Sequence, residues 1–212
     1  MGNLSKFISL EGLEGVGKTT NLAFIKETIE RAGHELIVTR EPGGTELGEA
    51  LRNVLLHSQH TMQAETEALM MAASRVEHVV TVILPALESG KWVLSDRYLD
   101  ASFAYQGGGR EIGVERVREL HTLAGVTRMP DLTILLDMPI ALGRARIAQR
   151  GEVDRIEAEA DPFFERCRAA YLEVANAEPS RVKVIDASEP LDAVQAGIAR
   201  VLEPLLASGS HG

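Results

Sequence analysis

The sequence predicts a doubly wound α/β domain in which helices flank a five-stranded parallel sheet. Five short apolar runs have the length and composition of buried strands, and segments with helical periodicity follow them. A glycine-rich turn follows the first run directly, as it would where a strand leads into a helix. This alternation is typical of a parallel sheet covered by helices. The predicted strands are residues 7–10, 36–39, 92–95, 132–136 and 182–185.

The first two strands are joined by a helix that the pattern predicts over residues 20–31. A mostly helical insertion, residues 46–89, then precedes the third strand, with a break near residues 57–62 and Pro85 close to its far end. The insertion is longer than a simple crossover requires, which makes it a candidate wall for a second binding site. The glycines at residues 107–109 interrupt the pattern after the third strand.

The composition indicates one compact domain over residues 1–207, followed by a flexible tail over residues 208–212. The chain has 212 residues, 45% of them hydrophobic, which is enough for one core. A net charge of -9 lacks the broad positive field that a polynucleotide requires, so we expect no nucleic-acid partner. The single cysteine, Cys167, cannot form an internal disulfide, and no leader or spanning segment stands out. We therefore expect a cytoplasmic protein with no membrane contact.

A phosphate-binding motif follows the first strand. It fits the pattern GxxxxGK[ST], and the helix continues from Thr20; the motif residues are Gly12, Leu13, Glu14, Gly15, Val16, Gly17, Lys18 and Thr19. The glycines allow backbone N–H groups to surround a triphosphate at a helix N-terminus. Lys18 would reach the β and γ phosphates, and the Thr19 hydroxyl is a ligand for Mg²⁺. The motif predicts a fold of the P-loop NTPase type and a pocket for ATP.

Three classes of protein use this motif: small-molecule kinases, GTP-dependent switches and ATPases that act on a partner. A switch would need an [NT]KxD motif to read guanine, and none of the five lysines is followed two residues later by Asp. The chain is too short for the further domain typical of a partner-driven ATPase. A small-molecule kinase is favoured, and a nucleotide-switched binding protein is the alternative from a different class.

Three further segments make the pattern specific. They are TREPGGT at residues 39–45, SDRYLDASFAYQGGGR at residues 95–110 and RGEVDR at residues 150–155. Together with the phosphate-binding motif, and in this order, they resemble the motifs of bacterial thymidylate kinases over nearly the whole chain. The resemblance implies transfer of the γ-phosphoryl group of ATP to dTMP, with Mg²⁺, usually in a homodimer. Another nucleoside monophosphate kinase is the alternative within the same class. The acceptor is a phosphate oxygen with a second pKa of ~6, so no strong general base is required.

The resemblance also implies roles for individual residues. Lys18, Arg97 and Arg150 are the expected catalytic residues, and Thr19 and Asp96 are expected beside Mg²⁺. Arg97 would hold the dTMP phosphate, and Arg75 would read the thymine O4 atom. The residues expected on the dTMP side are Glu14, Arg40, Glu41, Arg52, Met71, Arg75, Arg97, Ser102, Tyr105 and Gln106.

Met71 departs from the family pattern. It stands four residues before Arg75, where the family usually has a Phe that stacks on thymine. A thioether gains about 0.3–1.5 kcal/mol against an aromatic ring, so we expect binding to persist in a less rigid pocket.

A cluster of arginines, RARIAQRGEVDR at residues 144–155, stands out in this acidic chain. Some thymidylate kinases carry a basic residue inside the phosphate-binding loop where this chain has Gly15, and the resemblance is to the class that supplies the charge from a helical lid instead. We expect this lid over residues 144–160, with Arg150 at the γ-phosphoryl group. Arg146 and Arg155 are the expected supporting ATP contacts, Gly151 the flexible point, and Arg144 part of a solvated face.

Overall fold

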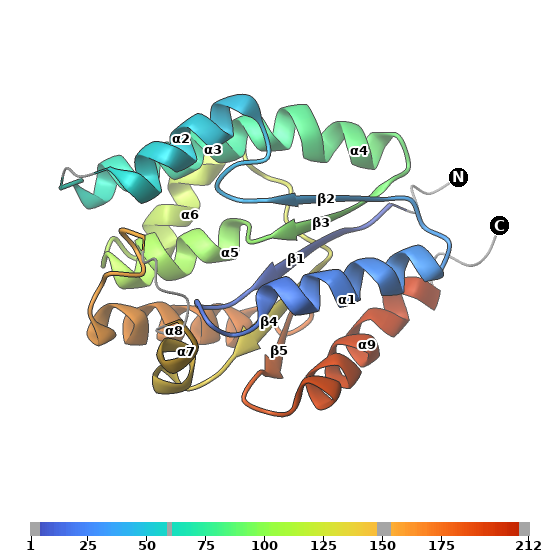
Figure 1. Cartoon of the computed structure of the whole chain (residues 1–212). Helices are drawn as coiled ribbons and strands as arrows, with labels where there is room; N and C mark the ends of the chain where they lie inside the picture. Colours follow the sequence, from blue (N-terminus) through green and yellow to red (C-terminus); the bar gives the residue numbers. More distant parts are fainter. Residues whose placement is uncertain (1–4, 59–60, 148–153, 208–212) are drawn as a thin grey trace.

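A five-stranded parallel sheet forms the centre of the computed structural model, which describes residues 5–58, 61–147 and 154–207 (Figure 1). The strands are β1 Phe7–Glu11, β2 Leu36–Arg40, β3 Trp92–Asp96, β4 Leu132–Asp137 and β5 Val182–Asp186. Their order across the sheet is β2-β3-β1-β4-β5, and every neighbouring pair is parallel. The predicted doubly wound α/β fold is confirmed.

Each strand continues one residue beyond its apolar run, and the added residue is charged. These residues are Glu11, Arg40, Asp96, Asp137 and Asp186. Backbone pairing extends to them, since Asp96 is in register with both Leu10 and Arg40. Because the strands are parallel, all five charged residues lie at the same edge of the sheet, where open α/β sheets bind ligands.

Helices cover both faces of the sheet and the side next to β2. They are α1 Lys18–Arg31, α2 Glu46–His57, α3 Ala64–His78, η1 Val79–Ile83, α4 Leu84–Glu88, α5 Leu99–Ser102, η2 Phe103–Gly109, α6 Val114–Leu123, α7 Ile140–Ile147, α8 Asp161–Ala177 and α9 Leu191–Ala207. Figure 1 shows α1 and α9 together on one face, and α2 to α4 running beside β2. Helix α8 contacts β5 and packs against η2, which in turn contacts α5 and α6.

Two π-helical segments differ from the sequence expectation. The predicted insertion is helical with a break between α2 and α3, but α3 runs through η1 into α4 without interruption. In η1 the N–H of Leu84 bonds to the carbonyl of Val79, and the missing N–H of Pro85 falls in the first turn of α4. The continuous helix Ala64–Glu88 has the length and apolar composition of a membrane span, with 44% of its most apolar window buried inside the fold.

The glycines after β3 form the last turn of η2, and the helix ends at Gly109, in line with the interruption that the sequence predicts. A Cβ atom at Gly108 would lie 2.7 Å from the carbonyl oxygen of Arg166, and one at Gly109 would lie 2.5 Å from the Cys167 sulfur. Glycine is therefore required here by the close approach of α8, which holds η2 against the sheet.

Candidate active site

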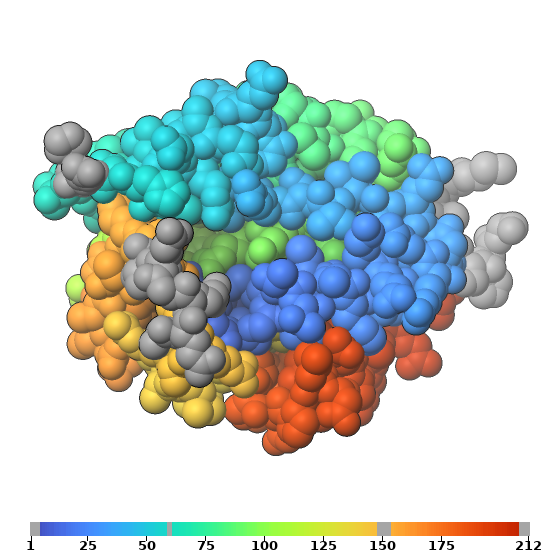
Figure 2. All heavy atoms as spheres, viewed as in Figure 1, coloured from blue at the N-terminus to red at the C-terminus, as the bar shows by residue number. Residues whose placement is uncertain are grey.

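A cavity of about 450 Å³ opens at the carboxyl edge of the sheet. The phosphate-binding loop and the start of α1 border it on one side, and α2 and α3 on another. In Figure 2 it is the hollow between the blue atoms of α1 and the cyan atoms of α2, with green atoms at its floor. The predicted site residues that line it are Glu14, Gly15, Gly17, Lys18, Thr19, Thr20, Glu41, Arg52, Met71, Asp96, Arg97, Tyr105, Gln106 and Arg146.

The phosphate-binding loop has the backbone that its glycines allow. Gly12, Gly15 and Gly17 have φ angles of 138°, 79° and 88°, in the region that favours glycine. Lys18 begins α1 directly after Gly17, and the first turn of this helix contains no acidic residue. The unpaired N–H groups and positive dipole end of α1 therefore form an anion-binding site.

Gly15 is also where the loop meets α7. A Cβ atom on Gly15 would overlap the backbone carbonyl of Gly143, and one on Gly143 would lie 2.8 Å from the carbonyl oxygen of Glu14. The Arg146 guanidinium donates to the Gly15 carbonyl at 3.3 Å. Two glycines thus allow the backbones of the loop and α7 to touch, which leaves no room for a side chain at position 15.

The Lys18 ammonium group is held by the loop itself. Its Nζ donates to the carbonyl oxygens of Gly12 and Leu13, each at 2.9 Å. Burial, with the nearby charge of Arg97, lowers the pKa of Lys18 to about 8, although Glu14 acts in the opposite direction. A bound phosphate would supply the anion that this ammonium group lacks.

Arg97 lies opposite Lys18 and is fixed by Glu14. Its Nη2 donates to Glu14 Oε1 at 2.6 Å, and its guanidinium lies 4.8 Å from the centre of the Tyr105 ring. Burial raises the pKa of Tyr105, so its hydroxyl keeps its proton and donates to both oxygens of Glu14 at 2.8 Å. Burial would raise the pKa of Glu14 too, but Arg97 and Lys18 outweigh it and keep the carboxylate ionised.

The backbone of Arg97 is unusual, because its φ angle is 69° although it is not a glycine. The Ser95 hydroxyl donates to its carbonyl at 2.6 Å, and its N–H bonds to the carbonyl of Leu10 at 3.0 Å. This turn directs the Arg97 side chain from the end of β3 towards the phosphate-binding loop.

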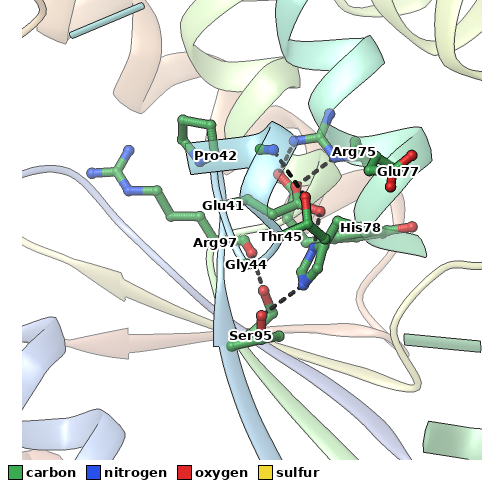
Figure 3. Close-up of polar contacts among 12 residues, drawn as sticks. Glu41, Pro42, Gly44, Thr45, Arg75, Glu77, His78, Ser95 and Arg97 are labelled. Carbon is green, nitrogen blue, oxygen red and sulfur yellow. Dashed lines mark hydrogen bonds and ion pairs between the residues drawn. The ribbon is translucent and has the colours of Figure 1, made fainter. Parts of the chain in front are cut away.

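Glu41 organises the wall next to β2, as Figure 3 shows. Its two carboxylate oxygens accept from Arg75 Nε at 2.6 Å and from His78 Nδ1 at 2.8 Å. His78 Nε2 then hydrogen bonds to the Thr39 hydroxyl at 2.6 Å. The loop after β2 is thereby fastened to α3.

Arg75 is 1% exposed and does not line the cavity. Besides Glu41, it donates to the Ser102 hydroxyl, the Tyr98 carbonyl and His121 Nε2. Burial and Arg75 lower the pKa of His121 to about 3, so its imidazole is neutral and accepts this bond. The expected reader of the thymine O4 atom is therefore occupied by protein partners, and that role stays a prediction.

Two more arginines flank the cavity. Arg52 lines it and donates to the Pro42 carbonyl at 2.9 Å, whereas Arg40 pairs with Glu49 at 2.8 Å and is about half exposed. Both lie next to the loop after β2, on the side expected for dTMP.

Thr19 and Asp96 both line the cavity, and they fit a phosphate-bound Mg²⁺ ion. Asp96 Oδ1 is buried without a hydrogen-bond partner among the described residues, as an acceptor awaiting a cation or donor would be. The described part of the chain contains no cluster of three potential metal ligands. An ion here would take most of its ligands from the nucleotide and water.

The arginines of the predicted lid separate in the structure. Arg155 donates to the Glu67 carboxylate at 2.6 Å and to the Leu55 carbonyl at 2.7 Å, so it lies against α2 and α3 and not beside the phosphate-binding loop. Its expected contact with ATP stays a prediction. Arg144 pairs with Asp161 at 2.9 Å and is 40% exposed, in line with a solvated face. Arg150 and Gly151 lie outside the described residues.

Several other predicted residues fall outside the cavity lining. They are Gly12, Leu13, Val16, Arg40, Arg75, Ser102 and Arg155. Gly12, Leu13 and Val16 belong to the phosphate-binding loop, and Arg75 and Ser102 are hydrogen bonded to each other behind the cavity wall.

A family model described as thymidylate kinase matches residues 10–198. The thymidylate kinase of Nitrosospira multiformis is 50% identical over 202 residues, covering 95% of this chain and 98% of the relative. That of Thiobacillus denitrificans is 52% identical over 200 residues, covering 94% and 97%. The thymidylate kinase of Bordetella pertussis is 46% identical over 205 residues, covering 97% and 98%. The chain belongs to the thymidylate kinase family.

Glu67 was not among the residues predicted from the sequence. It is 1% exposed, lines the cavity on α3 and accepts hydrogen bonds from Gln106, Arg110 and Arg155. Its position four residues before Met71 placed it on the same helix face as two predicted site residues, and that spacing was the available signal.

Gly15→Ala tests the contact between the loop and α7. We expect kcat/KM for ATP to fall by about 100-fold, because the loop or α7 must shift to admit the methyl group. Gly33→Ala is the matched control, since Gly33 has a φ angle of 88° with nothing within 4 Å of a Cβ atom. It should cost about 1 kcal/mol of stability and leave kinetics unchanged. If kcat/KM for ATP were the same in the two variants, the contact between the loop and α7 would not be needed for ATP use.

The lowered pKa of Lys18 predicts a pH dependence of ATP binding. A phosphate binds best to the charged ammonium group, so affinity should be full below about pH 8 and decline as the pH rises through this value. We expect the Kd for ATP, measured by calorimetry, to rise by about tenfold per pH unit above pH 8. Lys18→Arg stays charged over this range, and its Kd should lack this rise; the same pH profile in both proteins would refute the assignment.

Proposed function

We propose that this member of the thymidylate kinase family transfers the γ-phosphoryl group of ATP to the phosphate of dTMP, giving dTDP and ADP for nucleotide biosynthesis. The observation that carries the proposal is that two anion-binding sites face one cavity. One is the loop with Lys18, and the other is Arg97 held by Glu14. A phosphate donor and a phosphate acceptor fit this pair of sites.

The transfer proceeds in line and depends on charge neutralisation and positioning. An acceptor phosphate with a second pKa of ~6 is already ionised near neutral pH, so the oxygen attacks without a general base. Lys18 neutralises the β and γ phosphates, Arg97 binds the dTMP phosphate, and Arg150 approaches the transferring group. Arg146, which reaches the Gly15 carbonyl, supports the ATP side.

On the acceptor side, the proposal assigns Arg40, Glu41 and Arg52 to the phosphate and Met71, Tyr105 and Gln106 to the base and sugar, with Arg75 and Ser102 behind them, outside the cavity lining. Tyr105 is well placed to crowd a 2′-hydroxyl, because its ring lies under Arg97 and its hydroxyl is fixed on Glu14. This arrangement favours a deoxyribonucleotide.

Thr19 and Asp96 would hold Mg²⁺ together with the ATP phosphates. The ion would supply positive charge between the donor phosphates. Both residues line the cavity, and the unpartnered Asp96 Oδ1 supports this assignment.

The chain acts as a cytoplasmic homodimer with a lid over residues 144–160 and without nucleic-acid or membrane partners. Support for a dimer comes from Leu69 and Val80, which are 57% and 59% exposed and lie three helical turns apart on the α3–η1 helix. An identical apolar stripe on a second copy would cover them. The helix Ala64–Glu88 has 44% of its most apolar window buried inside the fold, which fits a protein interior better than a bilayer.

An acceptor panel tests the function. ADP release from ATP should be fastest with dTMP among dTMP, dUMP, dCMP, dGMP and AMP, because dTMP is the acceptor that membership of the thymidylate kinase family implies. Turnover on AMP alone would favour another nucleoside monophosphate kinase, and turnover on none would favour a nucleotide-switched binding protein.

Arg150→Ala should lower kcat by about 1,000-fold, the lower end of what an arginine acting on a transferring phosphoryl group contributes. The KM for dTMP should stay within about threefold, because the acceptor site is built by other residues. Arg144→Ala is the control, since Arg144 pairs with Asp161. A raised KM for dTMP with an unchanged kcat would contradict the role of Arg150.

A further inference from the structure

Glu67 is a buried carboxylate that three side chains from different segments converge on. Its oxygens accept from Gln106 Nε2 at 2.9 Å, from Arg110 Nε at 3.2 Å and from Arg155 Nη2 at 2.6 Å. Glu67 and Gln106 are each 1% exposed, and both line the cavity. The contact therefore lies where a ligand would meet the wall formed by α3 and η2.

The contact decides which way the Gln106 carboxamide faces. An ionised carboxylate only accepts hydrogen bonds, so the amide NH₂ group must turn towards Glu67. Burial would raise the pKa of Glu67, but its bonds to Arg110, Gln106 and Arg155 lower it below the ordinary value. The carboxylate is therefore ionised at neutral pH, and the amide orientation follows from chemistry.

The Gln106 carbonyl oxygen is left as a buried acceptor. Oε1 has no hydrogen-bond partner among the described residues. Such an acceptor calls for a donor from outside the described residues, because leaving it unpaired is costly, and a ligand in the cavity that Gln106 lines can provide one. A thymine or uracil base carries an N–H at N3 between two carbonyl groups, whereas cytosine presents a lone pair at N3.

We propose that Glu67 is a positioning residue that determines base specificity: it locks the carbonyl of Gln106 towards the acceptor base, so that a base with an N3–H is accepted and cytosine is rejected. This inference rests on the proposed function, because it assumes that the acceptor base lies against Gln106.

Glu67→Gln is the direct test. An amide at position 67 can donate or accept, so the Gln106 carboxamide can then turn either face to the base. The ratio of kcat/KM for dTMP to that for dCMP should fall at least tenfold. Glu65→Gln makes the same chemical change on the exposed side of α3 and leaves the Glu67–Gln106 bond in place, so its ratio should stay within about threefold of the unmodified protein.

A swapped pair provides the rescue. Glu67→Gln combined with Gln106→Glu reverses the bond: the amide on α3 now donates, and the carboxylate on η2 is an obligate acceptor whose second oxygen faces the base, so the pair should restore most of the dTMP preference. Gln106→Leu removes the carbonyl while keeping Glu67, and it should lower the ratio even if Glu67→Gln does not fold.

An unchanged ratio in folded Glu67→Gln, or in Gln106→Leu, would overturn the inference. A ratio in the swapped pair no higher than in Glu67→Gln would also overturn it. Failure of the proposed function is a separate result, because the unmodified protein would then show no turnover with dTMP.

Discussion

Pairing of buried arginines with glutamates is the constraint on which the cavity depends. The three pairs are Arg97–Glu14, Arg75–Glu41 and Arg155–Glu67. Each joins segments far apart in the chain; the carboxylates of Glu41 and Glu67 are almost wholly buried, and that of Glu14 is 12% exposed. Removing one partner would leave an uncompensated buried charge, which costs several kcal/mol. The carboxylates therefore hold the wall and floor of the cavity in one arrangement before a nucleotide arrives.

The same pairing sets the electrostatics of phosphate binding. Glu14 stays ionised beside Arg97 and Lys18, so the cations of the cavity are partly neutralised in the absence of ligand. An incoming phosphate must outcompete this carboxylate, and it can do so because it carries more charge and more acceptor oxygens. Glu14 thus keeps Arg97 aimed at the loop while leaving it able to exchange partners.

The sequence was sufficient to predict the sheet because each strand is a continuous apolar run between turn residues. It underestimated every strand by one residue, since the last residue is charged and pairs through its backbone at the ligand edge. The loop with Lys18 and the position of Arg97 were predictable from local motifs. The bond between Arg155 and Glu67 was not predictable. The two residues are 88 positions apart, and their bond depends on how the segment after residue 153 folds against α3. Nor could a motif reveal that Arg75 is surrounded by protein partners.

The contact between Gly15 and Gly143 places the phosphate-binding loop directly beside α7 and its arginines. Because the α7 backbone occupies the space beside Gly15, a basic side chain at position 15 could not enter the cavity without displacing α7. In the mechanism we propose, the positive charge for the transferring phosphate then comes from a side chain that reaches the cavity by another route. Arg146 shows that α7 provides one, since its guanidinium reaches the Gly15 carbonyl from the last turn of this helix. The close packing that excludes an arginine from the loop therefore also brings the arginine-rich segment to it.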